Sequence, residues 1–300
     1  MDRDPQLRDP RLRDPRLRNV HLRELLVGIE GLALLRRLLV GDDEEATARI
    51  AEVRRLVDEA GDAAFGLSAA APELGVRDGY AAWSATYDEP GNPLIGVEQP
   101  AVWAVLDAAR PGRALDAACG TGRHARRLAD RGHRVVGVDG SPEMLARAQA
   151  QVPEGHFSQG DLRDLPLPSD AFDLVVCSLA FDHVAELAQP VAELARVLRP
   201  SGRLVVSDVH PVLTSLGVAA YFRGADGASA FMRNHGHVHS EYLEAFAAAG
   251  LEVRRCIEPR FGDDEVAAQS LGMAFVPEAT RAAYDGLPGA LVWEVVRSSG

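Results

Sequence analysis

One stretch, ALDAACGTGRHARRLADRGHRVVGVDGS from Ala114 to Ser141, carries the strongest structural signal in this chain. Two short apolar runs enclose a glycine-rich turn and a segment with helical spacing of apolar residues. A strand, a glycine-rich turn, a helix and a second strand, in that order, are typical of a parallel βαβ unit. Ligands in such sheets bind at the carboxyl ends of the strands, so the residues that follow each strand are the candidate site.

The pattern continues from about residue 75, where short apolar runs alternate with amphipathic segments. It predicts an α/β domain with a doubly wound parallel sheet. The expected strands are 114–117, 134–138, 174–177, 204–207, 253–257 and 291–296. The expected helices are 122–131, 142–151, 187–198 and 241–249, the last with Ser240 as its N-cap.

The first 74 residues have a different character. A five-residue repeat, DPQLR DPRLR DPRLR from Asp4 to Arg18, predicts an extended arm, because each proline disfavours helical dihedrals in the preceding aspartate. Two helices are expected at 21–40 and 44–60. Each has apolar residues at helical spacing, which must be buried against the rest of the chain or a second subunit. These stripes are Leu22, Leu26, Ile29 and Ala33, and Ala46, Ile50, Val53, Val57 and Ala60. We therefore expect an extension at 1–74, acting as a cap or an oligomerisation element, and a catalytic domain at 75–300.

Composition excludes several functions. The formal charge of −12 argues against a nucleic-acid partner, which usually leaves a basic surface. All 32 basic residues are arginine, which excludes enzymes that depend on a catalytic or phosphate-binding lysine. The three cysteines fit neither a disulfide framework nor a zinc site. The first residues are charged and no run has the length of a membrane span, so we expect a cytoplasmic protein with a small-molecule ligand.

The glycine-rich turn alone leaves two interpretations open. Gly120-x-Gly122-x-x-Ala125 satisfies the dinucleotide fingerprint, and Asp139 would accept hydrogen bonds from the ribose of either a dinucleotide or an adenosyl group. Asp116 favours the second interpretation, since a negative charge there opposes a pyrophosphate and suits a ligand with an ammonium group.

The ordered motifs resemble those of class I S-adenosylmethionine-dependent methyltransferases that act on small molecules. The motifs are LDAACGTG, VVGVDGS, QGDLRDLPLP, FDLVVCSLAFDHV and LRPSGRLVVSD, and GYAAWSATYDEPGNP resembles the segment that folds over the cofactor. The resemblance implies a Rossmann-like methyltransferase fold with a mostly parallel seven-stranded sheet and S-adenosylmethionine as the cofactor. The family usually has glycine at the position of Ala118, a change that is tolerated if this residue has a negative φ.

The resemblance also implies the cofactor site. Asp116 precedes the turn around the methionine part, Asp139 binds the ribose, and Asp161 meets the adenine amino group. Cys119 and Cys177 are expected near the cofactor as small packing residues. The complete candidate set is Tyr80, Tyr87, Asp116, Ala118, Cys119, Gly120, Gly122, Asp139, Gly140, Ser141, Met144, Gly160, Asp161, Leu162 and Cys177.

Methyl transfer requires mainly alignment of the acceptor with the sulfonium, and a general base assists acceptors that lose a proton. His183 and His210 follow the fourth and fifth strands and are the candidates for this base, with Asp182 and Asp208 beside them.

Three alternating histidines, His235, His237 and His239, would share one face of an extended segment. We expect them to line the substrate pocket or pack a loop, and we expect no metal, because only Glu241 lies nearby in the sequence and methyl transfer needs none. They end the first of two insertions, 211–239 and 258–290, which are expected to contain helices over the acceptor site. Phe222, Phe231, Met232 and Phe275 could line an apolar pocket there or simply pack it.

The sequence thus predicts methyl transfer to a small molecule, of the kind made in specialised metabolism, by a protein that can self-associate through its N-terminal helices. The atom methylated stays open. Two alternatives are an enzyme that binds the same cofactor but catalyses cyclisation or elimination, and a non-catalytic partner subunit. A nicotinamide oxidoreductase is the least favoured, because of Asp116 and the later motifs.

Overall fold

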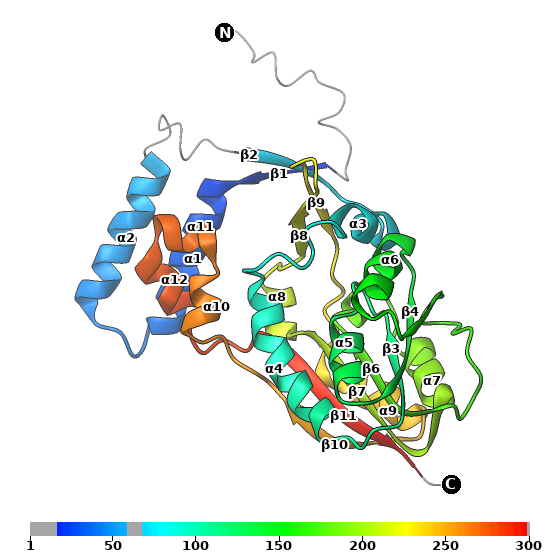
Figure 1. Cartoon of the computed structure of the whole chain (residues 1–300). Helices are drawn as coiled ribbons and strands as arrows, with labels where there is room; N and C mark the ends of the chain where they lie inside the picture. The colour runs from blue at the N-terminus through cyan, green and yellow to red at the C-terminus, as the bar shows by residue number, and fades with distance from the viewer. Residues whose placement is uncertain (1–16, 59–67, 299–300) are drawn as a thin grey trace.

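The computed structural model describes residues 17–58 and 68–298. The repeat up to residue 16 and Ala60 lie outside the described residues. The central feature is a seven-stranded sheet in which β11 runs antiparallel to both of its neighbours, β10 and β7, while the other strands run parallel to one another (Figure 1). Its strands, in spatial order, are β10 (Leu251–Ile257), β11 (Ala290–Arg297), β7 (Leu198–Val209), β6 (Phe172–Ser178), β3 (Arg113–Ala117), β4 (Arg134–Asp139) and β5 (His156–Gln159). The doubly wound fold and all six predicted strands are confirmed, while the short strand β5 was not predicted from the sequence.

Helices cover both faces of this sheet. On one face α4 (Pro93–Asp107) and α5 (Arg123–Asp130) pack on buried residues such as Ala114, Leu174 and Val205, with α6 (Pro142–Gln151) beside α5. On the other face α7 (Ala188–Val197) and α9 (His239–Ala248) enclose the larger core. The order of connections reverses between β3 and β6, so the edge where these two strands end is a topological switch point.

The start of α9 differs from the prediction. Its N-cap is Val238, and Ser240 lies inside the helix. The Glu241 carboxylate accepts a hydrogen bond from the Val238 backbone N–H at 2.7 Å, so a side chain within the first turn replaces the serine cap.

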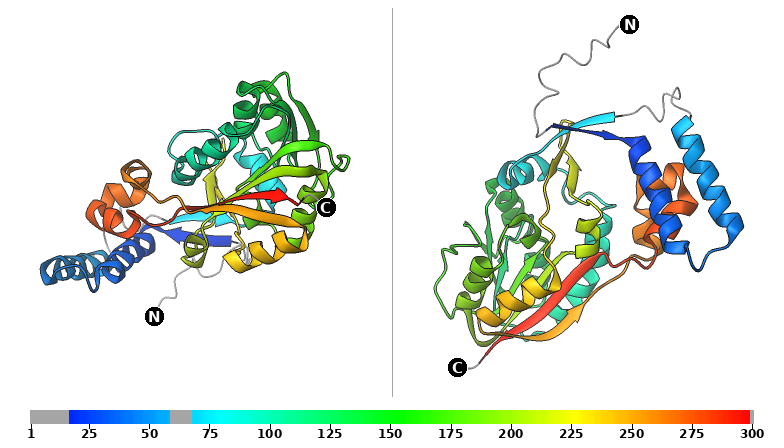
Figure 2. Two further views of the ribbon diagram at one scale, coloured as in Figure 1. Left: turned by 90° about the horizontal axis from the view of Figure 1, so that it is seen from below. Right: turned by 180° about the vertical axis from the view of Figure 1, so that it is seen from behind.

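The N-terminal residues form a separate group of helices with the second insertion (Figures 1 and 2). Strand β1 (Leu17–His21) pairs antiparallel with β2 (Ser68–Pro72), and they flank α1 (Leu22–Arg37) and α2 (Asp43–Asp58). The insertion supplies α10 (Asp263–Ala267), α11 (Ser270–Phe275) and α12 (Pro277–Tyr284). The predicted stripe on α1 is buried against α12, in a cluster with Val276, Ala279 and Ala283. The second insertion therefore covers α1.

The stripe predicted for α2 is not buried against the rest of the described chain, and burial against a second subunit stays a prediction. Ile50 and Val57 are half exposed, whereas Arg49 and Leu56 are buried. Arg49 can be buried because its guanidinium lies 2.8 Å from Glu45 and 3.5 Å from the buried Glu30 of α1, so its charge is paired. The residues at the end of α1, including Leu38 and Leu39, are also exposed.

The first insertion contains α8 (Pro211–Ser215) and a hairpin of β8 (Ala220–Arg223) and β9 (Ser229–Met232). Phe222 and Met232 are buried in this hairpin and pack against Tyr80 and Trp83 of α3 (Val76–Trp83). The expected helical cover is thus mainly a hairpin that supports α3. Among the described helices, none combines the length and the apolar character needed to cross a bilayer.

Candidate cofactor and acceptor site

A cavity of about 960 Å³ opens at the carboxyl ends of β3, β4, β5 and β6, at the topological switch point. Loops after all four strands line it, and α3 closes one side. Eleven of the residues predicted from the sequence line this cavity: Tyr80, Tyr87, Ala118, Gly120, Asp139, Gly140, Ser141, Gly160, Asp161, Leu162 and His183.

The glycine-rich turn is held in left-handed backbone conformations. Gly120 has φ of +51° and Gly122 of +92°, and a Cβ on Gly122 would lie 3.0 Å from the backbone of Ala148 in α6. Ala118 has φ of +56°, so the condition under which alanine would replace glycine without strain is not met. The turn needs the backbone geometry that glycine adopts without strain. Ala118 adopts the same geometry although it brings its Cβ into close contact with the carbonyl oxygen.

Replacing Ala118 with glycine is expected to stabilise the protein by about 0.5–1 kcal/mol. The left-handed conformation costs a residue with a Cβ about 1–2 kcal/mol, and the greater freedom of glycine in the unfolded chain offsets part of that. The free energy of unfolding, measured by chemical denaturation, checks this. Ala129→Gly in α5 is the matched control and should destabilise by about 1 kcal/mol. A loss of stability in both variants would contradict the argument.

Asp139 ends β4 and binds the turn as well as facing the cavity. Its carboxylate accepts hydrogen bonds from the backbone N–H groups of Gly120 and Ser141, both at 2.8 Å. Burial raises the pKa of this carboxyl, and the backbone hydrogen bonds counteract part of that rise. Each oxygen keeps a lone-pair position that can accept from a ribose hydroxyl.

Asp161 lies on the loop after β5 and is paired with Arg163. Arg163 donates to both carboxylate oxygens, from Nε at 2.9 Å and from Nη2 at 2.6 Å, and this pairing lowers the pKa of Asp161. The Arg163 backbone N–H also donates to Oδ1, at 2.9 Å, so the lone pair left for an adenine amino group is on Oδ2.

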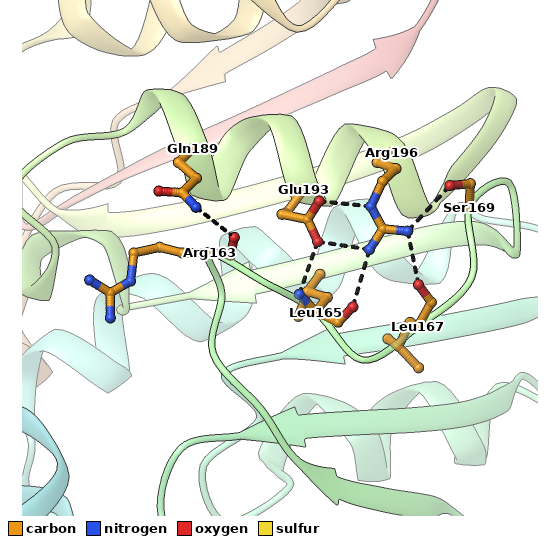
Figure 3. Close-up of polar contacts among 7 residues, drawn as sticks. All are labelled: Arg163, Leu165, Leu167, Ser169, Gln189, Glu193 and Arg196. Atoms are coloured by element: carbon orange, nitrogen blue, oxygen red, sulfur yellow. Dashed lines mark hydrogen bonds and ion pairs between the residues drawn. The ribbon is translucent and has the colours of Figure 1, made fainter.

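Helix α7 holds the loop that follows Asp161 (Figure 3). The Arg196 guanidinium donates to the carbonyl oxygens of Leu165 and Leu167 at 3.1 and 2.8 Å, and Gln189 donates to the carbonyl of Arg163 at 3.0 Å. Glu193 accepts from the Leu165 N–H at 2.9 Å and pairs with Arg196 at 2.7 Å. These side chains lie at positions i, i+4 and i+7, on one face of the helix. They satisfy backbone groups that no regular element pairs.

Replacing Arg196 with methionine is expected to weaken cofactor binding by about tenfold, because the loop carrying Asp161 loses three acceptor contacts at about 1 kcal/mol or less each. Calorimetric titration with S-adenosylhomocysteine measures it. Arg199→Met is the matched control, since Arg199 pairs with Asp173. Equal affinities of the two variants would show that the clamp does not position the loop.

Tyr80 and His183 line the cavity and are in direct contact. The Tyr80 hydroxyl lies 2.8 Å from Nε2 of His183, and Nδ1 of His183 lies 3.4 Å from the carbonyl of Arg233. A carbonyl only accepts, so we assign the imidazole proton to Nδ1 and the hydrogen bond at Nε2 to the tyrosine hydroxyl. Burial lowers the pKa of His183 and raises the pKa of Tyr80. At neutral pH both side chains are therefore uncharged, and Nε2 of His183 is the base that can accept the proton of the Tyr80 hydroxyl.

Tyr87 follows α3 and also lines the cavity. Burial raises its pKa to about 12. Thr121 of the glycine-rich turn donates to the Asp88 carboxylate at 2.8 Å, which ties this segment to the turn. The segment is therefore fixed beside the turn, and its folding over the cofactor stays a prediction.

Five predicted cofactor residues, Asp116, Cys119, Gly122, Met144 and Cys177, are not among the cavity-lining residues. The buried Asp116 accepts from the Ala125 N–H at 2.8 Å, and burial raises its pKa to about 7. It supports the start of α5 beneath the turn. Cys119 and Cys177 are buried, and burial raises the pKa of both thiols, which fits the packing role.

His210 is not at the cavity either. Its Nδ1 accepts from the Val212 N–H at 3.2 Å and its Nε2 lies 3.0 Å from the Glu258 carboxylate. The three alternating histidines have separate contacts: His235 lines the cavity, His237 donates to the Val184 carbonyl, and His239 contacts Glu258.

Two buried groups near the cavity have contacts that the sequence did not reveal. Asp208 accepts from the Asp182 N–H at 3.2 Å and from the Tyr242 hydroxyl at 2.7 Å. Burial raises the pKa of both aspartates, that of Asp182 to about 6.

Beneath the turn, the buried Glu98 of α4 binds Arg123 and Ser207, at 2.8 and 2.6 Å. The spacing of apolar residues after Asn92 predicts a helix, but it does not indicate that the Glu98 carboxylate within that helix is buried.

The fold and the cavity together define a nucleotide-cofactor-binding α/β domain with its site at the strand ends. Residues 115–206 match the family described as "Methyltransferase domain". A malonyl-[acyl-carrier protein] O-methyltransferase of Enterobacter lignolyticus is 40% identical over 121 residues, which is 40% of this chain and 48% of that protein. A demethylmenaquinone methyltransferase of Deinococcus radiodurans is 36% identical over 156 residues, which is 49% of this chain and 65% of that protein.

The crystal structure of an S-adenosylmethionine-dependent methyltransferase from Mesorhizobium loti is similar over 68% of this chain and all of that one, with 26% identity and a TM-score of 0.53. The chain thus contains a methyltransferase domain at 115–206, in a fold similar to that of S-adenosylmethionine-dependent methyltransferases. It spans about half the length of the first curated relatives that it matches.

Proposed function

We propose that this protein transfers a methyl group from S-adenosylmethionine to a small molecule bound beside Tyr80 and His183. The observation that carries the proposal is the shared cavity: the ribose-binding candidate Asp139 and the Tyr80–His183 pair line one space of about 960 Å³. The matched relatives named malonyl-[acyl-carrier protein] O-methyltransferase and demethylmenaquinone methyltransferase support a non-nucleic-acid acceptor. A specialised metabolite is the acceptor class we favour.

Different residues would bind the cofactor and accept the proton of the acceptor. Asp139 and Asp161 would hold the ribose and the adenine, and the backbone of the glycine-rich turn would hold the methionine part. The bound cofactor supplies an electrophilic methyl group. An acceptor hydroxyl or amine hydrogen-bonded to the Tyr80 oxygen would pass its proton to that oxygen while the Tyr80 proton moves to Nε2 of His183. The imidazole then carries the charge until solvent removes the proton.

Calorimetric titration with S-adenosylhomocysteine, with NADH as the control, tests the cofactor assignment without knowledge of the acceptor. Binding of S-adenosylhomocysteine alone supports it, and binding of NADH alone overturns it. An acceptor screen read by mass then tests transfer, because only transfer adds a methyl group. A product of unchanged mass would favour cyclisation instead.

We also propose that the exposed end of α1 mediates self-association. Leu35 in the last turn of α1, and Leu38, Leu39 and Val40 directly after the helix, are each more than 70% exposed. Such an apolar patch is typical of an interface. Leu39→Glu should convert a dimer to a monomer in light-scattering measurements; a wild-type protein that is already a monomer would contradict the proposal.

A further inference from the structure

Three side chains with metal-binding atoms converge at one corner of the sheet, outside the residues that line the cavity. His210 follows β7, His239 begins α9, and Glu258 follows β10. One carboxylate oxygen of Glu258 lies 3.0 Å from Nε2 of His210 and 2.9 Å from Nε2 of His239. The three ligand atoms all lie within 4.8 Å of one another. They come from segments 19 to 48 residues apart, so only the fold brings them together.

This ligand set suits a borderline divalent cation. Zinc binds imidazole nitrogen at about 2.0–2.1 Å and carboxylate oxygen at about 2.0–2.2 Å in tetrahedral geometry. Ligand atoms around such an ion lie about 3–3.5 Å apart, so an ion between these three needs only small side-chain movements. Two neutral imidazoles and one carboxylate carry a single negative charge, which partly neutralises the ion. Two histidines and one carboxylate also form a common zinc-binding set.

The surroundings leave room for a further ligand. His210 is buried and fixed, and the His239 ring contacts the Trp293 ring at 5.9 Å between centroids. The side chains of His239 and Glu258 are 39% and 42% exposed, so one side of the cluster faces solvent. A water molecule could complete the coordination from that side.

We propose that His210, His239 and Glu258 form a zinc-binding site that joins the ends of β7 and β10 to the start of α9. The site fixes Glu258, where the second insertion begins, and that insertion packs against α1. A metal there would stabilise the connection between the sheet and the N-terminal helices. The proposal is independent of the methyl-transfer function.

Zinc binding would require the ring proton of His210 to move from one nitrogen to the other, and this change can be measured. The Val212 N–H now donates to Nδ1 of His210, which leaves the ring proton on Nε2. Coordination through Nε2 moves this proton to Nδ1, where it faces the Val212 N–H. Zinc must therefore break this 3.2 Å hydrogen bond at the start of α8, and the Val212 amide should exchange faster with solvent.

The test uses the full chain without an affinity tag, stripped with EDTA and titrated calorimetrically with zinc chloride. We expect one zinc ion per chain, a Tm that rises by several degrees, and faster exchange of the Val212 amide. His239→Gln and Glu258→Gln should each weaken binding by more than tenfold, because even residues that only support a metal ligand contribute about 10–100-fold to affinity. Both positions are partly exposed, so both variants should fold.

Two controls separate this site from other zinc-binding groups. His156→Gln removes an exposed histidine on β5, and Cys256→Ser removes the exposed thiol of β10. Both should bind zinc like the wild type. The proposal is overturned if the wild type binds no zinc, if His239→Gln and Glu258→Gln keep its affinity, or if Cys256→Ser loses it.

Discussion

Replacing Asp139 with alanine is expected to weaken S-adenosylhomocysteine binding by about 100-fold or more. The variant loses two hydrogen bonds from ribose hydroxyls to a charged acceptor, each contributing about 1.5–3 kcal/mol in a site that excludes water. About 1.4 kcal/mol corresponds to tenfold in affinity. Calorimetric titration of the wild type and the variant measures the difference directly.

The control has to separate ribose binding from support of the turn, since Asp139 also accepts from the Gly120 and Ser141 amides. Asp139→Asn keeps one acceptor oxygen and should lose less affinity than Asp139→Ala. Thermal unfolding and circular dichroism check that both variants retain the fold. An unchanged affinity of Asp139→Ala would remove Asp139 from the cofactor site.

Replacing His183 with alanine is expected to lower kcat by about 100-fold or more while S-adenosylhomocysteine affinity stays close to that of the wild type, since general-base assistance contributes about 10²–10⁴-fold. Burial lowers the pKa of His183, so the wild type should lose activity only as the pH falls below about 6.5, the usual value for histidine. That acid limb should be absent from the variant. The measurement is kcat against pH with an acceptor found by the mass screen.

Tyr80→Phe is the matched variant, because it keeps the ring and removes only the hydroxyl that contacts His183. A proton relay through Tyr80 predicts a loss of kcat similar to that of His183→Ala, and a double variant no worse than either single one. His210→Ala provides the comparison, since His210 also follows a strand but does not line the cavity. A normal kcat in His183→Ala together with a low one in His210→Ala would reverse our assignment.

Local sequence patterns predicted the elements of the catalytic domain well. The glycine-rich turn, the strands around it and the acidic residues at strand ends are encoded within a few residues of each other. Asp139 and Gly120 belong to one βαβ unit, so their meeting at the strand ends follows from the right-handed connection of parallel strands. The same reasoning placed eleven candidate residues around one cavity.

The sequence was least informative where the same local pattern is compatible with two different structures. Ala118 shows no sequence sign of its positive φ, because alanine is compatible with either backbone sign and the turn around it imposes one. On α2 the face buried within the chain includes a charged residue, Arg49, which forms ion pairs with Glu30 and Glu45; a search for periodic apolar residues does not detect such a face.

By itself the sequence determined the class of fold, most of the residues that line the cavity and the absence of lysine chemistry, because these depend on residues close together in the chain. Only the tertiary structure decided which histidine faces the cavity. His183 and His210 both follow strands, but contacts with Tyr80 and with Glu258, 103 and 48 residues away, separate their environments. Such contacts are set by packing of whole elements, and the spacing of residues in the chain carries no record of them.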